Sequence, residues 1–149
     1  RTENHYKQLI ETLNLAGESC KKAGLRIGYH NHDFEFQSIK GVVVYDLILE
    51  ETEESLVDFE LDLYWIAHAG VDPIPYFEKY PGRFTMLHLK DRATDGNMVA
   101  VGNGEINFQS IFTRAELAGV KHYFVEHDNP TDAFASVSDS YRALSTMTF

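Results

Sequence analysis

The chain has a single cysteine, Cys20, and no apolar run that approaches the roughly 18 residues needed to span a bilayer. A lone cysteine cannot form an internal disulfide, which favours a reducing compartment such as the cytoplasm. Basic residues are also few: 13 Lys and Arg stand against 23 Asp and Glu, for a net charge of -10. Because this charge repels phosphate backbones and anionic lipids, we expect neither nucleic acid nor a membrane as partner.

Two further features are missing. The first residues, Arg1 to Tyr6, include neither an initiator methionine nor the pattern of a targeting peptide, which predicts that the sequence is an excerpt. The glycine pattern of a dinucleotide-binding fold is absent as well, since Gly102-Asn103-Gly104 follows no strand and lacks a third glycine. What is present, 149 residues of which 44% are apolar, suits one soluble domain with a sizeable core.

Hydrophobic periodicity predicts alternating helices and strands. Thr2 is a candidate N-cap for the first helix, whose apolar stripe includes Tyr6, Leu9 and Leu13. Such alternation is typical of a parallel sheet, and without a dinucleotide motif a barrel is favoured over an open sheet. The predicted helices are 2–23, 42–51, 73–80, 108–118 and about 131–144, and the predicted strands are 25–29, 56–62, 84–89 and 121–126.

Four such units amount to half of an eight-stranded barrel, which usually needs about 250 residues. An unclosed half barrel has exposed edge strands and an uncovered side of its sheet. We therefore expect the missing N-terminal half of the barrel, or a second copy of the chain, to cover them.

Polar side chains lie at the carboxyl end of each predicted strand, where the loops of parallel structures converge on one rim. His30 and His32 follow the first strand, Asp62 the second, His88 the third and Glu126 the fourth. An isolated residue of this kind is more often a cap or a loop residue, but four in succession favour a metal site. Mixed imidazole and carboxylate ligands suit Mn²⁺, Zn²⁺, Co²⁺ or Fe²⁺.

Other residues near these strand ends are candidates for substrate contact. Lys90 has the same strand parity as His88, so it either points into the barrel, where it can stabilise an enediolate, or pairs with Asp91 at the rim. Glu60, one layer deeper than Asp62, is expected to orient a ligand or Lys90.

Trp65 forms either an apolar wall against a sugar ring or part of the core. Glu105 follows a glycine-rich segment, 93–104, that suits a flexible lid and a plain turn equally, and it either contacts substrate or caps the next helix. Asp91 is the remaining substrate-binding candidate.

Several segments resemble the sugar phosphate isomerase/epimerase family, which shares the xylose isomerase-like (β/α)8 TIM barrel. The resemblance covers nearly all of 24–128 in the correct order and implies the C-terminal half of that α/β barrel. The segments are Gly28-Tyr-His-Asn-His-Asp-Phe-Glu-Phe36, Phe59-Glu-Leu-Asp-Leu-Tyr-Trp65, Ala69-Gly-Val-Asp-Pro73, His88-Leu-Lys-Asp91, Val101-Gly-Asn-Gly-Glu-Ile-Asn-Phe108 and Val125-Glu-His-Asp128.

The resemblance also implies a metal site of two glutamates, one aspartate and one histidine on the fifth to eighth strands. Asp62, His88 and Glu126 match three of these positions, whereas the fourth is His30, with His32 and Glu35 close behind. In related epimerases the two glutamates shuttle the proton on opposite faces of the substrate. With one replaced, Glu126 is the expected general base, and the opposing acid is His32, Glu35 or a metal-bound water.

The function implied is a metal-dependent isomerase or epimerase of a sugar, sugar phosphate or keto-sugar. Two alternatives remain. One is a metal-dependent lyase on 3-keto-glycosides, which forms the same carbanion-like intermediate. The other is a non-catalytic sugar-binding barrel, because the fourth ligand is altered.

Overall fold

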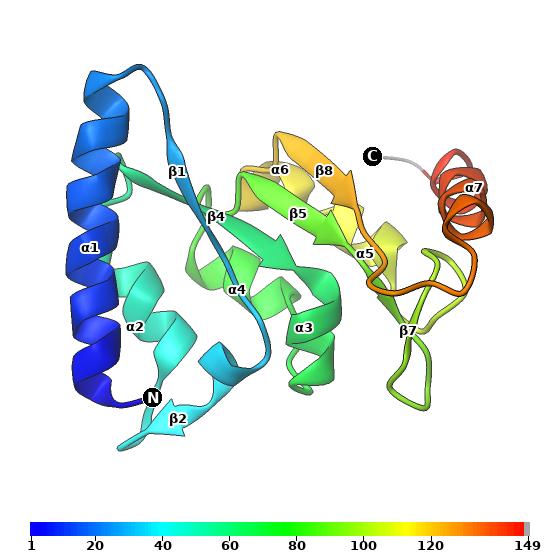
Figure 1. Cartoon of the computed structure of the whole chain (residues 1–149), viewed down its shortest axis with the longest axis horizontal. Coiled ribbons are helices and arrows are strands. Elements are labelled where there is room, and N and C mark those ends of the chain that lie inside the picture. The colour runs from blue at the N-terminus through cyan, green and yellow to red at the C-terminus, as the bar shows by residue number, and fades with distance from the viewer. Residues whose placement is uncertain (148–149) are drawn as a thin grey trace.

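The computed structural model describes residues 1–147. Its centre is a sheet of four parallel strands that lie side by side in chain order (Figure 1). The register pairs His30 with Glu60 and Asp62 with His88, so the carboxyl ends of these strands lie within two residues of one another along the sheet. The predicted parallel sheet is thus confirmed. Its strands are β1 (Ile27–His30), β4 (Val57–Asp62), β5 (Met86–Leu89) and β8 (His122–Val125).

The two faces of the sheet differ in chemistry because side chains alternate along each strand. Phe59, Leu61 and Leu87 are fully buried on the face that the helices cover. Their neighbours Glu60 and His88 point the other way and are only partly buried. The polar face is therefore the one on which functional groups gather.

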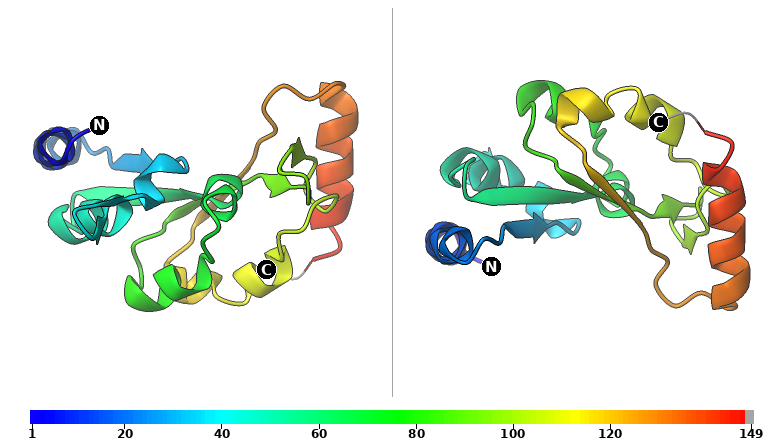
Figure 2. Two further views of the ribbon diagram at one scale, coloured as in Figure 1. Left: turned by 90° about the horizontal axis from the view of Figure 1, so that it is seen from below. Right: turned by 90° about the horizontal axis from the view of Figure 1, so that it is seen from above.

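Seven α-helices lie beside or at the ends of this sheet within the described residues. The first contacts β1 and β4, whereas the last lies at the opposite end of the molecule (Figure 2). None of the described helices is long and apolar enough to cross a membrane. The helices are α1 (Glu3–Lys22), α2 (Val44–Glu51), α3 (Leu63–His68), α4 (Ile74–Lys79), α5 (Phe108–Phe112), α6 (Ala115–Ala118) and α7 (Ala133–Leu144).

Helix α1 begins as predicted, because the Thr2 side chain accepts a hydrogen bond from the His5 amide. Its buried stripe is turned slightly from the expected one: Ile10, not Leu9, joins Tyr6 and Leu13 in the core. The stripe continues at Gly17, where any Cβ would lie 2.8 Å from Cβ of Leu56. Helix α1 therefore packs closely against Leu56 at this point, and only glycine fits there without a shift.

Two predicted helices differ from the structure. The helix predicted for 42–51 begins only at Val44, since β2 (Ser38–Ile39) and β3 (Val42–Val43) form a hairpin. Lys40 and Gly41 both have positive φ, as a tight type I′ turn requires. The helix predicted for 108–118 is broken between α5 and α6, where the Thr113 hydroxyl bonds back to the Ser110 carbonyl.

The glycine-rich segment predicted as a lid or turn is a second hairpin, formed by β6 (Asp91–Arg92) and β7 (Met98–Val99). A short 3-10 helix, η1 (Phe34–Phe36), follows β1. The main sheet stays open within the described residues, with β1 and β8 as its edges. Phe124 and Val125 on β8 are each 45% exposed, which agrees with the expectation of uncovered edges.

Candidate metal centre

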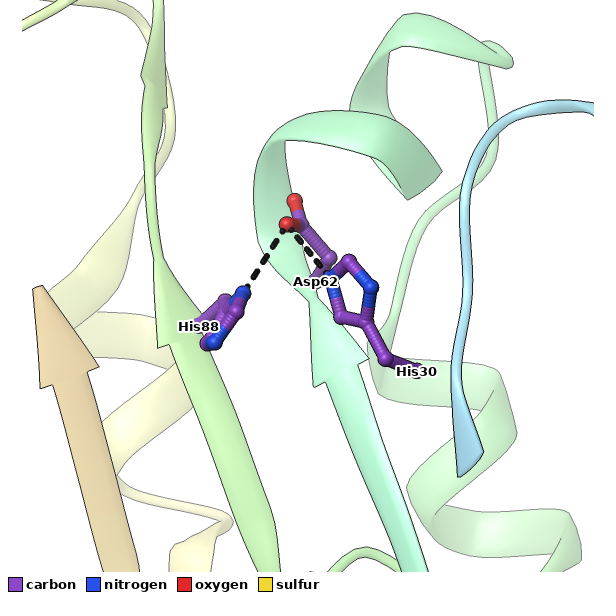
Figure 3. A group of neighbouring side chains, drawn as sticks. All are labelled: His30, Asp62 and His88. Carbon is purple, nitrogen blue, oxygen red and sulfur yellow. Dashed lines mark hydrogen bonds and ion pairs between the residues drawn. The ribbon is translucent and has the colours of Figure 1, made fainter. Parts of the chain in front are cut away.

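The four predicted strand ends deliver their side chains to one place. His30 and Asp62 are the last residues of β1 and β4, and Glu126 directly follows β8. The rings of His30 and His88 approach the Asp62 carboxylate from two sides (Figure 3). Nε2 of His30 lies 3.0 Å, and Nδ1 of His88 3.4 Å, from Oδ2 of Asp62. This series of side-chain contacts extends to Glu126, whose Oε2 lies 2.8 Å from Nδ1 of His88.

Asp62 is fully buried at the centre of this group. Its Oδ1 caps α3 by accepting a 3.0 Å hydrogen bond from the Trp65 amide, which leaves Oδ2 to face the histidines. Burial alone would raise the pKa of Asp62, but the hydrogen bond with His30 and the nearby ring of His88 hold it well below its ordinary value. Asp62 is therefore a carboxylate in this site at neutral pH.

The backbone of Asp62 is fixed by Asn31, a buried residue that the sequence analysis did not assign to the site. Oδ1 of Asn31 accepts a 2.9 Å hydrogen bond from the Asp62 amide. Because Asn31 follows His30 directly, this bond holds two candidate ligands at a fixed distance. The sequence gives no signal for this bond, because it joins Asn31 to a backbone amide 31 residues away.

His88 is held on both sides of its ring. Its Nε2 lies 3.1 Å from Oε1 of Glu60, and its Nδ1 faces Asp62 and Glu126. Burial lowers the pKa of His88, but the nearby Asp62 carboxylate and the charges of Glu60 and Glu126 raise it more, so the pKa lies above its ordinary value. A carboxylate behind a metal-ligating imidazole orients the ring and increases its basicity.

The ammonium of Lys90 lies inside the same cluster, because this side chain is only 3% exposed. Its Nζ is 3.3 Å from Oδ2 of Asp62, 3.0 Å from Oε2 of Glu126 and 3.2 Å from Oδ2 of Asp128. Asp128 is the second residue that the sequence analysis left out of the site. Asp128 lies two residues after Glu126, so in an extended segment both side chains point to the same side. This spacing was the signal in the sequence.

The residues present fit a divalent cation. Nδ1 of His88 and Oε2 of Glu126 are buried without an aligned hydrogen-bond partner, although each lies close to other site atoms. The candidate ligand atoms of His30, Asp62 and His88 all lie within 4.8 Å of one another. Ligands about 2.0–2.2 Å from one ion are separated by roughly 3–3.6 Å, so a small movement of these side chains accommodates the ion.

The segment after β1 places His32 and Glu35 differently. The His32 ring lies 5.1 Å from the His30 ring and 5.2 Å from the Trp65 ring, on the half-buried margin of the site. Glu35 is buried, and its oxygens accept hydrogen bonds of 2.7 Å from the Tyr29 hydroxyl and 2.9 Å from the His32 amide. Through these bonds Glu35 stabilises the loop after β1 and does not point to the candidate metal ligands. His32 stays beside those ligands.

Two predicted substrate contacts lie away from the ligand cluster. Asp91 is fully buried and accepts hydrogen bonds from backbone amides of its own loop, so it does not pair with Lys90. Glu105 forms an ion pair with Arg92 and lines a surface hollow together with Asp72 and Ser110. The helix that Glu105 was considered to cap is capped by Asn107 instead.

Comparison with known proteins defines the class. The profile of the family described as xylose isomerase-like TIM barrel matches residues 1–144. The chain belongs to this family, and its four-stranded parallel sheet corresponds to half of the barrel.

Among solved structures, the chain is similar to a sugar phosphate isomerase/epimerase from Parabacteroides distasonis, with a TM-score of 0.87 and 36% identity. The match covers 97% of this chain and 53% of that one.

Curated relatives carry a different name. The chain is 27% identical over 129 residues to an inosose dehydratase of Clostridium tetani, covering 74% of this chain and 43% of the relative. It is 26% identical over 153 residues to an inosose dehydratase of Geobacillus thermodenitrificans, covering 91% of this chain and 51% of the relative. The chain thus spans about half the length of the relatives it matches.

Proposed function

We propose that the protein removes a proton from the carbon next to the ketone of a sugar or cyclic polyol, with a divalent cation bound at this site. The observation that carries the proposal is the convergence of His30, Asp62, His88 and Glu126, linked by distances of 2.8–3.4 Å. These four residues would hold Mn²⁺, Zn²⁺, Co²⁺ or Fe²⁺. When bound, such an ion supplies Lewis acidity, which makes the C–H bond beside a carbonyl more acidic.

Glu126 is the general base of the proposal. Its side chain is 40% exposed although Oε2 is buried, so one end of the carboxylate faces the ligands while the remainder reaches the open side. A carboxylate in this position can take a proton from a substrate that lies over the cluster.

The ammonium of Lys90, surrounded by acidic groups, stabilises the negative charge that develops on the substrate oxygen. His32 and Trp65 form the margin against which the ring of the substrate lies.

Elimination of water is the outcome that we favour. Glu126 takes the proton from the carbon beside the ketone, the enolate electrons expel the hydroxyl group on the next carbon, and His32 gives that group the proton that makes it water. Two observations support this order of reaction steps. The site has a single glutamate at a base position, with His30 in place of the second one, and the curated relatives are named as dehydratases.

Epimerisation is the second candidate, because a structure 36% identical to this chain is named a sugar phosphate isomerase/epimerase. The first step is the same, but a proton is then added to the opposite face of the carbon and no group leaves. A 3-keto-glycoside would undergo the related elimination, in which the aglycone leaves in place of hydroxide.

The experiment uses the full-length protein supplied with Co²⁺ or Mn²⁺ in D₂O, with an inosose and a 3-keto-glycoside as probes. Proton NMR follows deuterium at the carbon beside the ketone, loss of water and release of aglycone. Loss of water or of the aglycone, with a product that has no hydrogen left at the carbon beside the ketone, supports elimination, whereas deuterium at an intact, inverted carbon supports epimerisation. If neither probe exchanges or reacts, the proposal is contradicted.

A further inference from the structure

The carboxylate of Asp91 is enclosed by its own loop. Oδ2 accepts hydrogen bonds of 2.9 Å from the amides of Gly102 and of Gly104. Oδ1 accepts bonds of 2.8 Å from the Arg92 amide and 3.2 Å from the Ile106 amide. One fully buried side chain thus joins both ends of the segment 92–106.

This arrangement bears on Lys90, the residue before Asp91. Their side chains lie on opposite sides of the strand, and the oxygens of Asp91 are already occupied by backbone amides. Asp91 is therefore not available as a counter-ion, and the ammonium of Lys90 turns to Asp62, Glu126 and Asp128. We propose that Asp91 is a positioning residue, which holds the 92–106 segment in place and thereby fixes the Lys90 ammonium at the ligand cluster.

The 92–106 segment contacts two other parts of the chain that lie next to the ligand cluster. The Asp128 amide donates a 3.0 Å hydrogen bond to Sδ of Met98 on β7, so the carboxylate partner of Lys90 rests on the hairpin. The Tyr64 hydroxyl donates to the Gly96 carbonyl at 2.9 Å and ties the hairpin tip to α3, the helix that Asp62 caps. A displaced hairpin therefore moves Asp128 away from Lys90.

Gly104 shows that the enclosure is closely fitted. A Cβ at this position would overlap Oδ1 of Asp91 and the Arg92 carbonyl. Gly104→Ala therefore disturbs the enclosure while Asp91 itself is kept, which provides an independent second variant. Asp95→Asn is the matched control, because Asp95 is exposed in the same hairpin and bonds only to Asn97 among the described contacts.

The test compares these three variants of the full-length protein by amide hydrogen exchange and by acylation of lysines with N-hydroxysuccinimidyl acetate. Asp91→Asn keeps one acceptor oxygen and turns an NH₂ group towards the other pair of amides, so one pair loses its bonds. We expect at least tenfold faster exchange of the Gly102 and Gly104 amides or of the Arg92 and Ile106 amides. We also expect at least tenfold more acylation of Lys90, whose side chain is only 3% exposed in the unmodified protein. Gly104→Ala should give both effects, and Asp95→Asn neither.

Faster exchange without a change in Lys90 acylation would overturn the proposal, since Asp91 would then stabilise the loop alone. Unchanged exchange in both variants would overturn it as well. If Asp91→Asn does not fold, Gly104→Ala carries the same test.

The kinetic consequence rests on the proposed function: kcat should fall at least tenfold while KM changes less than threefold. Because acylation and exchange need no substrate, a failure of the proposed reaction is distinguishable from a failure of this proposal.

Discussion

Oε1 of Glu60 lies 3.1 Å from Nε2 of His88, on the side of the imidazole ring opposite to the atom that faces Asp62 and Glu126. This pairing fixes the tautomer in which Nε2 carries the proton and Nδ1 offers its lone pair to a cation. Glu60 is thus placed to act on a metal ligand without being one.

Replacing Glu60 tests that relationship. Glu60→Gln keeps an acceptor for Nε2 but removes the negative charge, so the affinity for Co²⁺ should fall about tenfold or more. Isothermal titration of the metal-depleted protein measures this directly. Asp58→Asn is the control, because Asp58 lies on the same strand and face but pairs with Arg26. Equal affinities for Glu60→Gln and the unmodified protein would show that Glu60 does not support His88.

Replacing Glu126 separates proton transfer from metal binding. Glu126→Gln retains an oxygen that can ligate a cation but has no basic carboxylate. We expect deuterium exchange into a reactive keto-sugar to fall by a factor of about 100 or more, with less than a tenfold loss of metal affinity. Glu116→Gln on the exposed face of α6 is the control. Unchanged exchange in Glu126→Gln would remove this residue from the role of base.

Lys90 should have opposite effects on metal binding and on chemistry. Its ammonium lies 3.0 Å from Oε2 of Glu126 and 3.3 Å from Oδ2 of Asp62, so it competes with a cation for the same oxygens. Lys90→Met should raise the Co²⁺ affinity at least tenfold and lower the rate of proton exchange at least tenfold. Lys121→Met, at an exposed position, is the control. Weaker metal binding in Lys90→Met would show that the ammonium organises the site instead.

The pH dependence of metal binding follows from His88. Its pKa is raised above the ordinary value, since the surrounding carboxylates outweigh the effect of burial. A cation must displace the proton from Nδ1, so the affinity falls as the pH drops below that pKa, roughly tenfold for each pH unit. Titrations between pH 5 and 8.5 should show the change centred above about 6.5. Glu60→Gln should move it to lower pH, and a flat profile would contradict the assignment of His88 as ligand.

The sequence predicted the elements that depend on local pattern. Buried strands with polar ends were recognisable because each one ends in a histidine or carboxylate after an apolar run. Helix α3 was missed, since Leu63 to His68 continues the apolar character of β4 and its start depends on the cap from Asp62. Periodicity alone does not show where a strand ends and a helix begins within such a short apolar segment.

The parts of the site that depend on distant backbone atoms were not predictable. The position of Asp91 near a strand end predicts a substrate contact. Only the folded chain shows that its carboxylate instead accepts hydrogen bonds from the amides of Gly102 and Gly104. The role of Asn31 likewise depends on a distant backbone group, because its Oδ1 accepts a hydrogen bond from the Asp62 amide. In both cases the side chain satisfies buried main-chain groups, which no spacing rule in the sequence reveals.

X-ray absorption spectroscopy of the full-length protein, purified without chelator, tests the claim that His30, Asp62, His88 and Glu126 enclose one cation. We expect close to one equivalent of a transition metal, with two imidazole nitrogens and carboxylate oxygens at about 2.0–2.2 Å. His30→Ala should reduce the imidazole contribution by half. Less than about a tenth of an equivalent of any transition metal, even after addition of Co²⁺ or Zn²⁺, would contradict the claim and favour a non-catalytic sugar-binding barrel.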